Sequence, residues 1–261
     1  MGTDSKIEWC SHTFNPWWGC TKVSPACAHC YAESFAKRTG HAIWSDAAPR
    51  RFFGAKHWDE PLKWDRAAAK SGRVERVFCA SMADIFEIHP DPEIAARQDE
   101  ARRQLARVIA ETPNLRWLLL TKRPENWSAL GAQLGWCLGP SGWYEPTGRI
   151  WMGATTENDE YFERRSTNLI KIPAAAHFVS YEPALGPIGD HPNLAALDWV
   201  ICGSESGPRA RSADLAWFKS MRRRCAAAGT AFFMKQITER GHKVPFEYWP
   251  EDLQVRQFPP G

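Results

Sequence analysis

The sequence predicts an α/β fold in which parallel strands and helices alternate around a barrel. The length of 261 residues is typical of one α/β barrel, and 44% of the residues are hydrophobic, which is enough for a sizeable core. From residue 74 onward, short β-branched and aromatic runs alternate with helical stretches, which predicts parallel βαβ units. These runs are apolar nearly throughout, as expected for strands that are buried on both faces.

The N-terminal part carries a close group of cysteines. A Pro-aromatic stretch at residues 14–19 predicts a short first strand. Three cysteines with C-x6-C-x2-C spacing follow it: Cys20, Cys27 and Cys30. Ser24-Pro25 marks a turn inside this loop, and residues 31–38 predict the first helix. Residues 10–38 therefore form a cysteine loop together with its helix.

The rest of the chain divides into an irregular segment, a series of βα units and a C-terminal tail. Residues 40–65, rich in Trp, Pro and Arg, are expected to form an irregular lid over the barrel mouth. Residues 74–240 hold the βα units, and residues 241–261 form a C-terminal tail. Strands are expected at residues 76–82, 115–121, 149–155, 176–182, 197–204 and 230–236. Helices are expected at residues 92–111, 125–134, 158–170 and 213–228, with a surface insertion at 135–148. No linker separates these parts, so residues 1–261 are expected to form a single domain.

Polar residues follow each predicted strand. In a parallel barrel the carboxyl ends of the strands meet at one mouth, where functional groups gather. The candidates are Ser81, Asp84, Lys122, Arg123, Thr155, Glu157, Asn158, Glu182, Ser204 and Glu205. The cysteine loop follows the predicted first strand, so it should lie at the same mouth. The alternative interpretation is turn and helix-capping chemistry, with Asn158 and Asp214 as caps.

Composition limits the classes of function. No apolar run approaches the roughly 18 residues that cross a membrane, and the N-terminus lacks a signal-peptide pattern, so we expect a cytoplasmic protein without a membrane partner. The net charge of +3 permits a polyanionic partner without arguing for one. In a reducing compartment, eight cysteines are not expected to form a disulfide framework. Their tight cluster therefore indicates metal binding or catalysis.

The cysteine loop suits two kinds of metal centre. An iron–sulfur cluster held by three thiolates leaves one iron open for a substrate or cofactor. A structural zinc ion instead favours a closed tetrahedral site, with His29 or His12 as the fourth ligand. Zinc motifs usually supply a second cysteine pair, which this chain lacks, so the sequence favours the open cluster. Cys79 and Cys202 lie in apolar strand contexts, where a free cysteine is normally a core residue.

A three-cysteine loop after the first strand of an α/β barrel resembles the radical S-adenosylmethionine (SAM) superfamily. The usual spacing there is C-x3-C-x2-C, and here His29 takes the position of the usual aromatic. The chain is also similar, over nearly its whole length, to the phage Gp37/Gp68-like (DUF5131) family. The similar stretches are residues 15–25, 119–124, 180–183, 185–187 and 203–207. The resemblance implies a partial parallel (β/α)6-7 TIM-like barrel of the radical SAM type.

The same resemblance implies cofactors and roles for the candidate residues. Cys20, Cys27 and Cys30 would hold a [4Fe–4S] cluster that cleaves SAM to methionine and a 5′-deoxyadenosyl radical. The superfamily binds the methionine amino group after the second strand, here at Ser81 or Asp84. It binds the ribose after the fourth strand, here at Thr155, Glu157 or Asn158. Lys122 or Arg123 would meet the SAM carboxylate or a substrate phosphate. The remaining candidates are Glu182, Ser204 and Glu205 for cofactor binding, and Cys79 and Cys202 as hydrogen donors to a product radical.

The implied partners are a reductant of the flavodoxin or ferredoxin type and a nucleic acid or nucleotide substrate. Phosphate contacts and base stacking fit the basic, aromatic residues 41–64 together with Arg209 and Arg211. A resemblance to spore-photoproduct-lyase-like radical enzymes favours modification or repair of that substrate. Two other functions stay open. One is a zinc-stabilised nucleic-acid-binding protein without catalysis, and the other is a barrel hydrolase or transferase with Glu182 and Glu205 as its acid–base pair.

Overall fold

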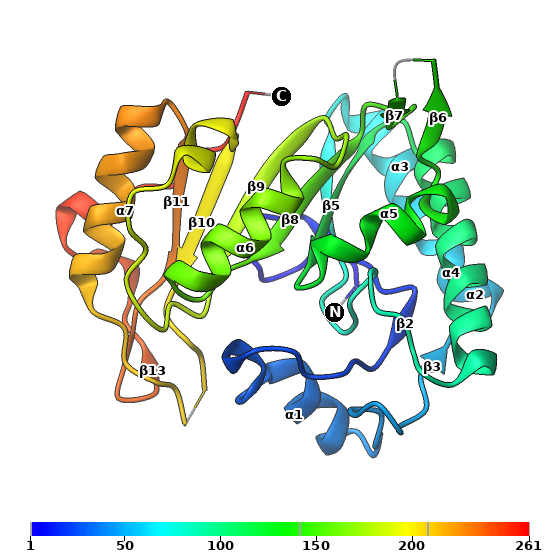
Figure 1. Cartoon of the computed structure of the whole chain (residues 1–261), viewed down its shortest axis with the longest axis horizontal. Helices are drawn as coiled ribbons and strands as arrows, with labels where there is room; N and C mark the ends of the chain where they lie inside the picture. Colours follow the sequence, from blue (N-terminus) through cyan, green and yellow to red (C-terminus); the bar gives the residue numbers. More distant parts are fainter. Residues whose placement is uncertain (1, 141, 208, 261) are drawn as a thin grey trace. The chain divides into compact units, whose positions relative to one another are not determined.

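Seven strands form the main sheet of the protein (Figure 1), whose computed structural model describes residues 2–140, 142–207 and 209–260. Their order is β1 (His12–Thr13), β4 (Glu75–Cys79), β5 (Leu115–Thr121), β8 (Ile150–Thr155), β9 (Ala176–Tyr181), β10 (Trp199–Gly203) and β11 (Ala231–Gln236). The pairs β1–β4, β4–β5, β9–β10 and β10–β11 are parallel. β1 and β11 are the two ends of this order, so the predicted fold class, a partial parallel (β/α) barrel, is confirmed.

Six of these strands lie where the apolar runs predicted them, with small differences at their ends. The first strand differs from the prediction. β1 is only two residues long and precedes the Pro-aromatic stretch. Inside that stretch, β2 (Trp17–Trp18) pairs antiparallel with β3 (Arg51–Phe52), outside the main sheet. Pro16 separates the two short strands and has no backbone N–H for a ladder.

Contacts divide the chain into two compact units, with a boundary inside β8. Unit 1 comprises the chain up to residue 22 together with residues 32–152 and 172–175. Unit 2 comprises residues 23–31, 153–171 and the chain from residue 176 onward. The single domain expected from the sequence stays a prediction, and each unit is described by itself.

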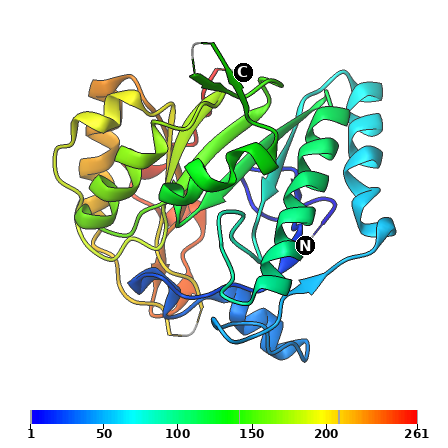
Figure 2. The same ribbon diagram turned by 45° about the vertical axis from the view of Figure 1, so that its right-hand side comes forward.

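In unit 1, two helices lie side by side next to the strands (Figures 1 and 2). They are α3 (Glu60–Ser71) and α4 (Pro92–Glu111). α4 begins where predicted because Asp91 caps it, accepting hydrogen bonds from the N–H groups of Glu93 at 2.8 Å and Ile94 at 3.3 Å. α3 ends at Gly72, whose φ of 64° lies in the left-handed region that favours glycine.

The segment expected to be an irregular lid is partly ordered. Residues 40–65 contain β3, the short helix α2 (Ala55–Trp58) and the start of α3. Within α3, Pro61, Trp64 and Ala68 are buried at the i, i+3, i+7 spacing of one helix face. The helical spacing of these apolar residues is present in the sequence, but the many Pro and Trp residues before them obscured it.

The predicted helix at 125–134 is broken into three turns: η2 (Pro124–Asn126), α5 (Trp127–Leu130) and η3 (Gly131–Leu134). The predicted insertion after it forms a hairpin of β6 (Cys137–Gly139) and β7 (Gly142–Tyr144). The helix after the cysteines is α1 (Tyr31–Arg38), as predicted.

In unit 2, α6 (Asp159–Leu169) and α7 (Leu215–Ala228) accompany the strands. Both caps follow the sequence: Asn158 accepts from the Tyr161 N–H at 3.1 Å, and Asp214 accepts from the Ala216 N–H at 2.8 Å. Gly153 in β8 permits a close approach, since a Cβ there would lie 2.2 Å from the Phe178 ring. The remaining elements are η1 (Pro25–Cys27), η4 (Pro192–Ala196), β12 (Thr238–Glu239), β13 (His242–Lys243), η5 (Phe246–Tyr248) and η6 (Glu251–Leu253). Within the described ranges, no helix combines the length and apolar character needed to cross a bilayer.

Candidate functional site

In unit 1, the residues that follow β4 and β5 form a buried ion pair. Arg123 Nη1 donates to Asp84 Oδ2 at 2.8 Å, and both side chains are less than a tenth exposed. Asp84 also accepts from Thr121 Oγ1 at 2.6 Å and from the N–H groups of Lys122 at 2.9 Å and Phe86 at 3.0 Å. Two carboxylate oxygens accept about four hydrogen bonds, so these donors occupy the capacity of Asp84.

This pair stays charged. Burial alone would raise the pKa of Asp84, but the Arg123 guanidinium and the hydrogen bonds from Thr121 and the backbone outweigh it, so the pKa is lowered. Burial works to lower the pKa of the Arg123 guanidinium, but Asp84, Cys20 and Glu87 together outweigh it, so the pKa is raised. The Asp84 carboxylate therefore serves to hold the Arg123 guanidinium in place.

Arg123 in turn contacts the first cysteine of the loop. Its Nη1 lies 3.6 Å from Cys20 Sγ, and its Nη2 donates to the Thr21 carbonyl at 2.6 Å. Burial raises the pKa of the Cys20 thiol to about 12, although the guanidinium opposes the shift. The nearby guanidinium therefore favours the Cys20 thiolate but does not offset the effect of burial.

A second buried ion pair fixes the chain next to Cys20, and the sequence reasoning missed it. Arg50 donates to both oxygens of Glu87, from Nε at 2.9 Å and from Nη2 at 2.8 Å. Glu87 also accepts from the Thr21 N–H at 2.7 Å and from Gln98 Nε2 at 2.9 Å. The available signal was a third polar residue after β4, because Glu87 follows Ser81 and Asp84 at the same interval of three residues.

Ser81 lies at the end of β4 but is tied to the N-terminal stretch. Asn15 Nδ2 donates to Ser81 Oγ at 3.1 Å, and Asn15 Oδ1 accepts from the Met82 N–H at 2.6 Å. Asn15 therefore joins the chain that leads to Cys20 to the end of β4. This link is local to unit 1.

In unit 2, an Arg–Glu pair holds the segment that carries Cys27 and Cys30. Glu205 follows β10, and its Oε2 accepts from Arg211 Nε at 2.9 Å and from the Arg211 N–H at 2.8 Å. Arg211 Nη1 then donates to the Pro25 carbonyl at 3.0 Å, and His29 Nδ1 lies 3.0 Å from Glu205 Oε2. Burial works to raise the pKa of Glu205, but its hydrogen bonds from Arg211 and His29 lower it overall. We call Glu205 and Arg211 the loop clamp.

A third buried ion pair lies after β8. Arg165 Nη1 donates to Glu157 Oε2 at 2.7 Å and to the Thr155 carbonyl at 2.8 Å, and both side chains are fully buried. The other Glu157 oxygen accepts from the Ala26 N–H at 3.4 Å, which adds a second hold on the cysteine segment. The neighbouring Thr156 Oγ1 is fully buried and has no hydrogen-bond partner among the residues that the structure describes.

The other candidates of unit 2 have local partners. Glu182 accepts from Lys235 Nζ at 2.6 and 2.8 Å. The Ser204 carbonyl accepts from Gln236 Nε2 at 2.7 Å, and Asn158 caps α6. The Lys235 ammonium therefore balances the negative charge of the Glu182 carboxylate.

The remaining candidate residues Cys79 and Cys202 are fully buried in β4 and β10. Burial raises the pKa of both thiols, and the Cys202 thiol is raised further by the nearby Cys225 and Glu182. This is the environment of a core cysteine.

The cysteines of the loop have the chemistry of cluster ligands. All eight cysteines are free thiols, and Cys20, Cys27 and Cys30 are each only partly buried as whole residues. In the portion of the chain that the structure describes, no three or more His, Cys, Asp or Glu side chains form a ready metal site. Thiolates are the usual ligands of iron–sulfur clusters, so the side-chain type of these cysteines fits such a group.

A family model covers nearly the whole chain. The model described as "Protein of unknown function (DUF5131)" matches residues 4–249. The chain belongs to the DUF5131 family. This confirms the family expected from the sequence. No curated protein matches this DUF5131 chain.

Among solved structures, the DUF5131 chain is similar to spore photoproduct lyase complexed with dinucleoside spore photoproduct. The identity is 14%, the TM-score is 0.46, and the match covers 78% of this chain and 58% of that one. A mutant of the same enzyme with the dinucleoside has 12% identity and a TM-score of 0.48, over 92% of this chain and 61% of that one. The DUF5131 chain thus spans about three fifths of the length of these lyase structures. The likeness concerns the fold alone.

Proposed function

We propose that the chain is a radical SAM enzyme in which Cys20, Cys27 and Cys30 hold a [4Fe–4S] cluster. The observation that carries this proposal is the anchoring of the cysteine loop within each unit. In unit 1, Arg123 follows β5 and contacts the Cys20 sulfur. In unit 2, residues after β8 and β10 bind the segment with Cys27 and Cys30. Functional groups of parallel barrels gather at such strand ends.

Each protein group has a defined task in this account. A reduced cluster held by Cys20, Cys27 and Cys30 would supply the electron that cleaves SAM to methionine and a 5′-deoxyadenosyl radical. Arg123 places a hydrogen-bond donor on the Cys20 sulfur and favours its thiolate. Asp84 fixes Arg123, and since its four acceptor positions are taken, we assign it to positioning rather than to SAM. Ser81 and Lys122 remain the candidates of unit 1 for the amino acid part of SAM.

The end of β8 is proposed to bind the ribose of SAM. The unpartnered, buried hydroxyl of Thr156 supports a polar ligand there, because such a group normally finds a partner. Glu157 and Glu205 already have ion-pair partners, so their tasks are to hold the cysteine segment. The substrate is proposed to be a nucleic acid or nucleotide, and the electron donor a flavodoxin- or ferredoxin-type protein in the cytoplasm.

The cluster can be tested by metal analysis. Protein reconstituted anaerobically with iron and sulfide should hold about four irons per chain and show iron–sulfur absorbance. Cys20→Ala, Cys27→Ala and Cys30→Ala should each lose most of the cluster, because each removes one ligand. Cys137→Ala is the matched control, since Cys137 is exposed in the β6–β7 hairpin. A triple variant that kept its iron would refute the assignment, and one tight zinc with no iron would favour the zinc-stabilised alternative.

A further inference from the structure

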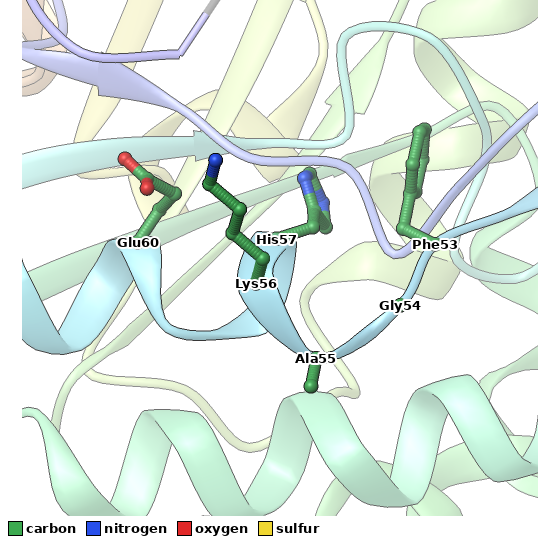
Figure 3. A pocket seen from close by; sticks show the side chains of 6 residues that line it. All are labelled: Phe53, Gly54, Ala55, Lys56, His57 and Glu60. Carbon is green, nitrogen blue, oxygen red and sulfur yellow. The ribbon is translucent and has the colours of Figure 1, made fainter.

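A pocket of about 490 Å³ lies in unit 1, lined by residues other than those assigned above. One short run of chain lines it: Phe53, Gly54, Ala55, Lys56, His57 and Glu60 (Figure 3). Figure 3 shows Phe53 and His57 projecting to the same side of this run. The volume falls in the range of small-molecule sites.

Stacked rings form one wall of the pocket. The Phe53 and His57 rings lie 4.2 Å apart at 28°, and the His57 ring stacks in turn on Phe14 at 4.7 Å and 20°. His57 Nε2 also lies 2.9 Å from the Asn15 carbonyl, which fixes the ring. A preformed aromatic face loses little conformational freedom when a flat ligand stacks on it.

The surroundings of the stack are positively charged. The exposed Arg51 guanidinium lies 4.8 Å from the Trp18 ring and 5.3 Å from the Phe53 ring. Lys56 is exposed at the pocket itself. Glu60, the acidic residue of the pocket, pairs with Lys63 at 2.7 Å, so its charge is largely balanced. The local balance favours an anionic ligand.

The same surface is built on the chain that leads to Cys20. Trp18 pairs with Arg51 between β2 and β3, two residues before Cys20. Asn15 contacts His57 through its carbonyl and Ser81 through its side chain. Within unit 1, the aromatic wall and the end of β4 are therefore connected through one residue.

We propose that this surface, formed by Trp18, Arg51, Phe53, Lys56 and His57, binds single-stranded nucleic acid. An unstacked base enters the pocket against Phe53, while Arg51 and Lys56 meet the flanking phosphates. Proteins that bind single strands combine aromatic faces with a positive groove in this way. The assignment deepens the proposed function by naming where a nucleic acid substrate docks, but binding can be measured without the cluster.

Fluorescence anisotropy with labelled oligo-dT and oligo-U of about twelve nucleotides tests the site on the full chain. Phe53→Ala should weaken binding at least about fivefold because a stacking face is lost, whereas Phe53→Trp should retain it. Tyr144→Ala is the control for an exposed aromatic. Lys56→Ala should lower the slope of log affinity against log salt by about 0.7, with Lys70→Ala as its control.

Gly54 offers a test that removes no group. Its φ of −85° is ordinary for any residue, and a Cβ there would meet no atom of the described part of the chain within 4 Å. Gly54→Leu should therefore fill the pocket and weaken binding at least about fivefold, while Gly54→Ala should bind like wild type. The contrast between the two variants also separates blocking from misfolding.

The proposal is overturned if neither oligonucleotide binds at low salt, or if Phe53→Ala and Gly54→Leu bind like wild type. Iron content and SAM cleavage are measured on the same preparations. If these are intact while oligonucleotide binding is absent, this inference fails and the radical SAM assignment stands. If the cluster is absent while both variants weaken binding, the nucleic acid surface stands alone. Preference for oligo-dT or oligo-U then distinguishes DNA from RNA.

Discussion

Arg123 is the residue around which the polar groups of unit 1 gather. It joins the Cys20 sulfur, the Thr21 carbonyl and the Asp84 carboxylate through its two terminal nitrogens. A planar guanidinium can serve several acceptors in fixed directions, which a lysine ammonium does less well. The sequence placed Arg123 at a strand end and suggested a ligand contact, but its partners are distant in the chain and no local pattern reveals them.

The Asp84–Arg123 pair gives a stability prediction. Asp84→Asn should lower the free energy of unfolding at pH 7 by about 3 kcal/mol, because it leaves a buried guanidinium without its carboxylate. Urea unfolding measures the loss. Glu60→Gln, which removes a partly exposed ion pair with Lys63, should change stability by less than about 1 kcal/mol.

The pH dependence has a defined sign. The pKa of Asp84 is lowered in the folded chain, so its contribution is present above the ordinary carboxyl pKa of about 4 and is lost as the pH falls through the folded value. The stability gap between wild type and Asp84→Asn should therefore narrow in acid. An Asp84→Asn protein as stable as wild type at pH 7 would contradict this account of the pair.

At the scale of elements, the segment with Cys27 and Cys30 depends on residues far away in the sequence. Its own turn, η1, is three residues long and supplies few internal hydrogen bonds. The loop clamp and Glu157 provide the contacts to Pro25, His29 and Ala26. Short segments of this kind are ordered by tertiary contacts rather than by their own propensity.

Arg211→Ala should therefore loosen the cysteine segment. Loss of charge-assisted hydrogen bonds is expected to speed amide hydrogen exchange of residues 26–30 roughly tenfold, as measured by mass spectrometry of the protein without metal. Arg209→Ala, a change of a nearby exposed arginine, should leave the exchange unchanged. Equal exchange in wild type and Arg211→Ala would mean that the clamp does not hold the segment.

The predictable elements were those with a strong local signal. α4 has a cap, a proline at its first position and a long apolar period, and its bounds agree with the sequence prediction. The strands β5, β8 and β9 are continuous apolar runs and were also found. The single helix predicted at 125–134 was not found, since Gly131 interrupts it. The pairing of β2 with β3 was not predicted either, because the two strands are far apart in the sequence and no periodicity encodes such a pair.

At the scale of the whole molecule, the sheet order agrees with the fold class that the sequence predicts, and the family model agrees with the predicted family. The strand-end candidates fall into two sets. Asp84, Glu157 and Glu205 are engaged in ion pairs that hold the chain, while Ser81, Lys122 and Thr156 remain the proposed contacts of SAM. Carboxylates at strand ends look alike in a sequence, whichever task they perform.

The most direct test of the central claim is the release of 5′-deoxyadenosine and methionine from SAM. Reconstituted protein, reduced anaerobically and incubated with SAM, should form both products in equal amounts, as measured by liquid chromatography and mass spectrometry. Cys137→Ala should do the same, and Cys30→Ala should form neither. If fully reconstituted and reduced wild-type protein leaves SAM intact, or if Cys30→Ala cleaves it at the same rate, the chain is not a radical SAM enzyme.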